Sequence, residues 1–290
     1  MRRLWRMLAV FPDSFDHLAA AAVWEIKNAA EAKDRLSDLV ARSMVEWDET
    51  TGRYRLHDLA RLFAEAQLIK DEAEKYQAQQ RHAVHYKDVL TAAGELYLEG
   101  GEKMMQGLKL FDTEWINIQA GQAWAAMNSC KDKTVAEICN NFNEYLGATH
   151  ILNLRLHPRD WTIWLEAALA AARQLQNRQA EVVHLGNLGN AYSDLGEPRR
   201  AVEYFEEHLA IAREIGDKRG EGNSLGNLGN AYAVLGEPRR AIEYSEQDLV
   251  IAREIGDRRG EGNALGNLGI AYANLGEPRR AIEYYEQVLS

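Results

Sequence analysis

The sequence predicts an all-α solenoid preceded by a small domain that contains a short β-hairpin. A forty-residue block begins at Leu185 and restarts at Leu225 and Leu265, most of the chain shows helical periodicity, and strand-like runs occur only near residues 44–56. Self-similarity at a period of roughly 20–50 residues is typical of stacked repeats, because each unit buries its apolar face only against its neighbours. A stacked array presents an extended groove, which favours binding over catalysis.

Residues 1–70 are predicted to form a small separate domain. Helical patterns at about 2–9, 15–24 and 31–42 precede two strand-like runs, Met44–Trp47 and Arg53–Leu56, joined by a turn. Another helix starts near His57, and one of its faces carries the apolar residues Leu59, Leu62, Phe63, Ala66 and Ile69. Three helices followed by a hairpin suggest a winged helix.

Residues 71–180 keep the helical period without clear repetition, and we expect degenerate helical hairpins there. Apolar residues recur at helical spacing in four segments: Tyr76–Ala93, Glu114–Met127, Val135–Leu146 and Trp161–Leu175. The regular array then covers residues 181–290, and its third copy is truncated.

Each regular copy predicts two helices, A and B. In the first copy, helix A ends at Gly196, and helix B opens with Pro198, whose missing N–H is harmless in a first helical turn. Helix B ends at Gly216, a glycine stop. Glycines 186 and 189 within helix A each cost about 1 kcal/mol relative to alanine, so we expect them to permit close helix contact. The basic pair at 199–200 does not suit the helix dipole, and local electrostatics do not explain it.

The composition argues against several classes of protein, among them nucleic-acid-binding, disulfide-rich and membrane-spanning proteins. The net charge of −10 argues against a nucleic-acid surface spread over the whole protein. Cys130 and Cys139 form neither a disulfide framework nor a zinc motif, which favours a reducing cytoplasm. No run approaches about 18 uncharged apolar residues, so no membrane segment is predicted. No cofactor is expected.

The residues of the first copy resemble the tetratricopeptide repeat in its longer forty-residue form. The resemblance rests on the spacing of Leu188-Gly189, Tyr192, Gly196, Pro198 and Ala201. This variant resembles the repeats of Pins-type polarity adaptors and, less closely, those of kinesin light chains. The resemblance implies antiparallel helix pairs in a right-handed superhelix, with helix A on the concave side.

The first seventy residues resemble the winged-helix segment of bacterial STAND (NB-ARC type) signalling ATPases. The resemblance rests on the segment 11–15, FPDSF, and on Leu56-His57-Asp58, which matches a Met-His-Asp motif with leucine in place of methionine. In that family the histidine contacts the β-phosphate of ADP held by a neighbouring P-loop domain. The sequence contains no G-x-x-x-x-G-K-[ST]. His57 would therefore sense a nucleotide only beside a P-loop partner, and is otherwise a helix-start histidine.

Asparagines on helix A are the predicted partner-binding residues. They are Asn187, Asn190, Asn223, Asn227, Asn230, Asn263, Asn267 and Asn274. Asparagine is a mediocre helix former, and its amide both donates and accepts hydrogen bonds, which suits the backbone of an extended peptide. The alternative is an asparagine ladder that joins neighbouring helices. A carboxylate clamp would need basic residues where Gly186, Gly266 and Ile270 stand.

Other candidate sites are weaker. His82 and His85 share a helix face, but no third metal ligand has a fitting spacing, so no metal site is predicted. No catalytic motif is present. Three residues of the last helix, Ile282, Tyr285 and Leu289, would form an apolar patch suited to end-to-end self-association.

These observations predict a non-enzymatic sensor or regulatory module of a STAND-type protein that binds a protein or peptide in its groove. One alternative is a free-standing scaffold adaptor of Pins type. Another is a DNA-binding regulator acting through the winged helix, which is disfavoured because the segment 31–42 has nearly balanced charge.

Overall fold

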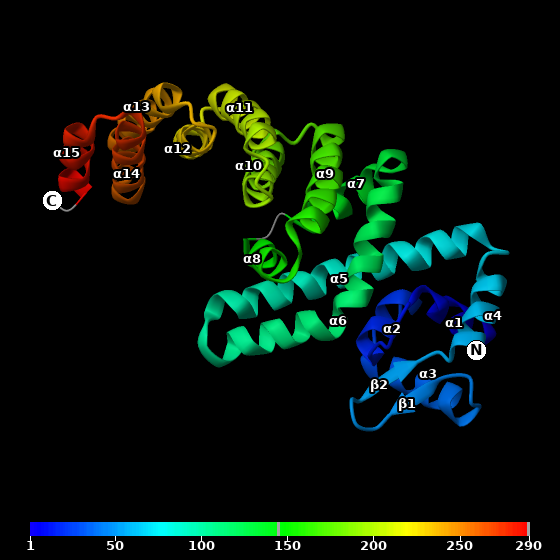
Figure 1. The fold of residues 1–290 in the computed structure, drawn as a ribbon. Helices are drawn as coiled ribbons and strands as arrows, with labels where there is room; N and C mark the ends of the chain where they lie inside the picture. The colour runs from blue at the N-terminus through cyan, green and yellow to red at the C-terminus, as the bar shows by residue number, and fades with distance from the viewer. Residues whose placement is uncertain (144–145, 289–290) are drawn as a thin grey trace. The chain divides into compact units, whose positions relative to one another are not determined.

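The computed structural model describes residues 1–143 and 146–288. The chain divides into two compact units, residues 1–154 and 155–290, which are described separately below (Figure 1). The predicted segment 71–180 is thus divided between the two units. The fold is all-α with one two-stranded sheet.

The first unit opens with short helices and the expected hairpin. The elements are α1 (Arg2–Met7), a 3₁₀ turn (Leu8–Val10), α2 (His17–Trp24), α3 (Ala29–Ala41), β1 (Glu46–Asp48), β2 (Arg53–Arg55) and α4 (Asp58–Leu68). β1 and β2 pair antiparallel, with Trp47 opposite Tyr54. Phe15 adds a bridge to Tyr54, so the segment before α2 lies along the hairpin. The winged-helix interpretation rests on this element order and stays a prediction.

Helix α4 presents its predicted apolar face to solvent. Leu59 is 72% exposed and Leu62 is 57% exposed, and Phe63, Ala66 and Ile69 are also exposed. The buried residues are Ala64 and Leu68, on the side that contacts α1 and the 3₁₀ turn. The smaller face of α4 is buried, so an apolar surface is left open within this unit.

Helices α5 (Glu72–Glu99) and α6 (Gly101–Asn128) form a hairpin longer than the sequence predicts (Figure 1). Gly100 and Gly101 turn the chain at φ values of +76° and +57°. A buried ion pair joins this hairpin to β2: Arg53 Nη1 lies 2.5 Å from Glu114 Oε1, and Nη2 lies 2.8 Å from Oε2. The unit continues through a 3₁₀ turn (Ser129–Lys131), α7 (Lys133–Asn141) and α8 (Leu146–Arg155).

The second unit is an array of antiparallel helices. They are α9 (Pro158–Leu175), α10 (Arg178–Asp194), α11 (Pro198–Ile215), α12 (Lys218–Val234), α13 (Pro238–Ile255), α14 (Arg258–Leu275) and α15 (Pro278–Val288). Each helix contacts the next along the chain, and α12 also contacts α10 and α14 (Figure 1). Helices α10, α12 and α14 correspond to helix A of successive copies, and α11, α13 and α15 to helix B.

The predicted helix boundaries of the array follow its local signals. Helix α11 begins at Pro198 and ends before Gly216. Gly216 has a φ of +72°, in the left-handed region, which ends the helix and begins the turn to α12. The Asp217 side chain then accepts a hydrogen bond of 2.9 Å from Gly220 N and so caps α12. Gly256 and Asp257 repeat this arrangement before α14.

The structure explains the second arginine of the basic pair that local electrostatics left unexplained. Arg200 lies 4.2 Å from the ring centroid of Tyr192 and pairs with Glu197 at 3.3 Å. Tyr192 in turn stacks on Tyr204. The same cation–π contact recurs in the next two copies through Arg240 and Arg280. The arginine therefore joins helix B to the end of its own helix A.

Candidate functional site: an amide-lined groove

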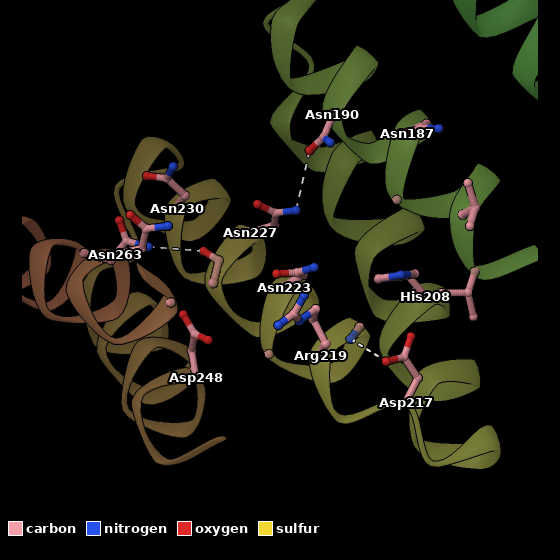
Figure 2. A pocket seen from close by; sticks show the side chains of 18 of the residues that line it. Asn187, Asn190, His208, Asp217, Arg219, Asn223, Asn227, Asn230, Asp248 and Asn263 are labelled. Atoms are coloured by element: carbon pink, nitrogen blue, oxygen red, sulfur yellow. Dashed lines mark hydrogen bonds between the residues drawn. The ribbon is translucent and has the colours of Figure 1, made fainter. Parts of the chain in front are cut away.

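The second unit contains a groove of about 750 Å³. Residues of α10, α12 and α14 form its wall, and His208 of α11 and Asp248 of α13 also line it (Figure 2). Glycines at 186, 226 and 266 expose helix backbone to this space. The groove therefore offers backbone, amide and ionisable groups on a concave surface.

Seven of the eight predicted asparagines line this groove: Asn187, Asn190, Asn223, Asn227, Asn230, Asn263 and Asn267. The eighth, Asn274, is exposed near the end of α14 and is not part of the lining. Ile270 stands where a stripe asparagine would continue and also lines the groove. The structure thus brings the amides of three helices to one surface.

Two long hydrogen bonds connect the stripe across repeats. Asn227 Nδ2 donates to Asn190 Oδ1, and Asn267 Nδ2 donates to Gly226 O, each at 3.5 Å (Figure 2). Both distances lie at the long limit for a hydrogen bond. Over the part of the chain that the structure describes, the side chains of Asn223 and Asn230 form no hydrogen bond. The ladder alternative accounts for only part of the stripe.

His208 presents a hydrogen-bond acceptor to the groove. Ser224 Oγ donates to Gly220 O at 2.8 Å, so the His208 Nδ1–H must be the donor in its contact with Ser224. This leaves Nε2 as an acceptor, and a Cβ built on Gly186 would lie 3.6 Å from it. Burial lowers the pKa of His208, against a smaller opposing effect of Asp217, so the ring is neutral at pH 7.

Asp248 is the residue that the sequence prediction missed. It is 6% exposed, and burial, aided by the Asp257 carboxylate, raises its pKa to about 7. It stands at the position in the second copy that His208 occupies in the first. The signal available in the sequence was this change of residue between otherwise near-identical copies.

His57 is the N-terminal capping residue of α4. It is exposed and caps α4, because its Nδ1 accepts a hydrogen bond of 3.3 Å from Leu59 N. A nucleotide-sensing role for this residue stays a prediction that depends on a P-loop partner.

The histidine pair of α5 belongs largely to the core. His82 packs against Phe11 and Tyr86, and burial lowers its pKa to about 3. His85 is half-buried beside Tyr86. Within residues 1–143 and 146–288, no three His, Cys, Asp or Glu side chains gather into a group able to hold a metal ion.

Two of the three residues of the predicted self-association patch are described, and both are exposed. On α15, Ile282 is 56% exposed and Tyr285 is 41% exposed. Leu289 lies outside the described residues. End-to-end association stays a prediction. Among the described helices, none has both the length and the apolar character needed to cross a membrane.

Comparison with known proteins identifies the repeats. Residues 185–219 and 220–290 match models of the tetratricopeptide repeat. A search of curated proteins gives no match. Residues 185–290 are therefore tetratricopeptide repeats, a module of protein–protein interaction.

Solved structures show the same fold. A Podosopora anserina putative kinesin light chain with nearly identical TPR-like repeats is 17% identical, with a TM-score of 0.50 over 70% of this chain and 94% of that chain. BtubC (BKLC) from P. vanneervenii is 16% identical, with a TM-score of 0.51 over 73% of this chain and 89% of that chain. A STAND protein with a tetratricopeptide repeat sensor from Pyrococcus horikoshii is 14% identical over 99% of this chain and 56% of that chain, with a TM-score of 0.42, too low to support an argument.

Proposed function

We propose that the groove of the second unit binds an extended segment of a protein partner, and that the chain has no enzymatic activity of its own. The observation that carries this proposal is the set of groove-lining amides that form no hydrogen bond with any residue the structure describes, among them those of Asn223 and Asn230. An extended backbone exposes N–H and C=O groups at regular intervals, and an asparagine amide can pair with both. The bare glycine backbone lets such a segment approach closely.

The test uses the full chain and a library of random dodecapeptides displayed on phage. Peptides enriched by the wild-type protein are synthesised, and their Kd values are measured by fluorescence anisotropy. We expect Asn223→Ala and Asn230→Ala each to weaken binding by about tenfold, which corresponds to one or two hydrogen bonds. Circular dichroism should show unchanged helix content, because neither side-chain amide forms a hydrogen bond with a described residue.

Asn274→Ala is the matched control. Asn274 is also an exposed asparagine of a helix A, but it does not line the groove. Its substitution should leave the Kd unchanged. Equal Kd values for all three variants and the wild type would assign the stripe to repeat stacking and contradict the proposal.

We further propose that the chain is the sensor and regulatory part of a STAND-type signalling system. Supporting this are the Leu56-His57-Asp58 motif at the start of α4, of which His57 and Asp58 are exposed, and the exposed apolar residues that follow it, Leu59 and Leu62. A neighbouring P-loop domain would cover such a face, since exposed apolar patches commonly mark interaction sites.

Co-expression tests this second proposal. A P-loop ATPase domain encoded beside this chain should co-purify with it, and Leu59→Asp combined with Leu62→Asp should abolish the association without unfolding the protein. If the gene has no such neighbour, the Pins-type scaffold alternative is favoured.

A further inference from the structure

Among the groove positions at which the copies of the repeat differ, one carries an ionisable group in two of them. In the forty-residue register His208, Asp248 and Val288 are equivalent, whereas Asn187, Asn227 and Asn267 form an invariant series. Both His208 and Asp248 line the groove. One amide series is thus constant while the buried group beneath it changes from an imidazole to a carboxylate, which is the arrangement expected of a position that selects among ligands.

Asp248 lies against bare backbone of α12. A Cβ built on Gly226 would lie 2.7 Å from Asp248 Oδ2, and one built on Gly222 would lie 3.3 Å from Oδ1. In the first copy Val182 stands at the position of Gly222. The two glycines thus leave room for the carboxylate beside α12, and any larger residue at Gly226 would displace it. Figure 2 shows the carboxylate among the groove-lining side chains.

The Asp248 carboxylate has no polar partner in the described part of the chain. Across the described residues no hydrogen bond or ion pair reaches Asp248, although it is more than nine-tenths buried. Arg219 also lines the groove, but no ion pair joins the two side chains. Buried polar groups are nearly always paired. A purely structural role would be served as well by asparagine or leucine, which fill similar space without the desolvation cost of a carboxylate.

We propose that Asp248, between the glycines 222 and 226, forms a subsite for a basic side chain, lysine or arginine, of the segment bound in the groove. The ligand supplies the cation that the protein lacks at this point, while the amide stripe holds the ligand backbone. The inference rests on the proposed peptide-binding function and deepens it, because it specifies the chemistry of one residue of the ligand. The perturbed ionisation of Asp248 agrees with a functional carboxylate.

The experiment compares three forms of the full chain against the same random dodecapeptide library: wild type, Asp248→Asn and Glu243→Gln. Glu243 is an exposed carboxylate on the same helix that does not line the groove, so its variant controls for net charge. We expect the wild type and Glu243→Gln to enrich peptides with lysine or arginine at one defined position. The Asp248→Asn protein should lose this preference while still enriching peptides.

A double-mutant cycle then measures the contact. Replacing the selected basic residue by norleucine should weaken binding to the wild type about tenfold, and should weaken binding to Asp248→Asn less than about twofold. Asparagine is nearly isosteric with aspartate, so circular dichroism should show a folded variant. If Asp248→Asn does not fold, the same cycle is measured with a second variant, Asp248→Leu.

The outcomes separate this inference from the function on which it rests. Peptides that bind without a basic residue, or an equal norleucine effect in wild type and Asp248→Asn, overturn the subsite alone. If no peptide is enriched by the wild type, the groove-binding function fails and the subsite fails with it. A basic preference lost also in Glu243→Gln assigns the effect to general charge and overturns the subsite.

Discussion

Gly189 is the position in the array where a single added methyl group should be most disruptive. A Cβ built there would lie 2.3 Å from Cε1 and 2.5 Å from Cδ1 of the Phe205 ring, and this ring is buried, at 2% exposure. Helix propensity favours alanine over glycine by about 1 kcal/mol, whereas overpacking a core typically costs about 1–3 kcal/mol. Because the contact is so short, we expect the upper part of that range, and a net loss of about 1–2 kcal/mol for Gly189→Ala.

Gly266→Ala is the matched control on α14. A Cβ built on Gly266 meets no atom within 4 Å, so its substitution should raise the free energy of unfolding by up to about 1 kcal/mol. The assay is equilibrium urea unfolding followed by circular dichroism, with the slope m checked for constancy. The two variants should therefore differ by about 2–3 kcal/mol, the sum of these opposite effects.

Phe205→Leu provides the second arm of this test. The smaller side chain should relieve the contact, so Gly189→Ala should cost less in the Phe205→Leu background than in the wild type. A Gly189→Ala protein as stable as Gly266→Ala, or an equal cost in both backgrounds, would show that the glycine is not needed for this helix contact.

Three further outcomes follow from the array. Ser245→Ala should raise the free energy of unfolding by about 1 kcal/mol, because the Ser245 hydroxyl is buried without a partner among the described residues; a lower urea midpoint would contradict this. Tyr192→Phe should lower it by about 1 kcal/mol, because Tyr192 OH donates to Glu166 Oε1 at 2.9 Å across the repeat boundary, and an unchanged midpoint would show that the bond contributes nothing. The pKa of Asp248, about 7 in the folded state against an ordinary 3.8, means that the wild type loses stability as the pH rises from about 4 to 7. Asp248→Asn should remove this dependence, exceeding the wild type above pH 7 and converging with it near pH 4, and parallel pH profiles from urea titrations would refute the assignment.

Helix boundaries in the array could be predicted because their signals are local. Proline at a first helical turn and glycine with positive φ act through the backbone of one or two residues, so Pro198 and Gly216 determine the ends of α11 without any knowledge of packing. The same holds for the groove amides: a stripe on one helix face follows from the helical period alone, and the repetition places the stripes side by side.

The remaining features depend on tertiary contacts that the period does not contain. The face of α4 that is buried is the one with Ala64 and Leu68, and the bulkier apolar face is open, because packing against α1 decided which side is covered. Arg200 could not be interpreted from its own helix, since its stabilising partner is the Tyr192 ring on the preceding helix. Asp248 was hidden for the same reason: its burial arises from the neighbouring helix.

The proposed recognition of a ligand and the stacking of repeats would share one asparagine series. Asn227 uses its Nδ2 to contact the preceding repeat, and its Oδ1 forms no hydrogen bond within the described residues. Asn223, one turn earlier on the same helix, makes no such contact. The stacking contacts are long, so they contribute little energy, yet they orient the amides that carry them. Repeat packing thus positions a surface of partly unused hydrogen-bonding groups, and in the proposed function the residue that varies beneath it, His208 in one copy and Asp248 in the next, would give that surface its chemical selectivity.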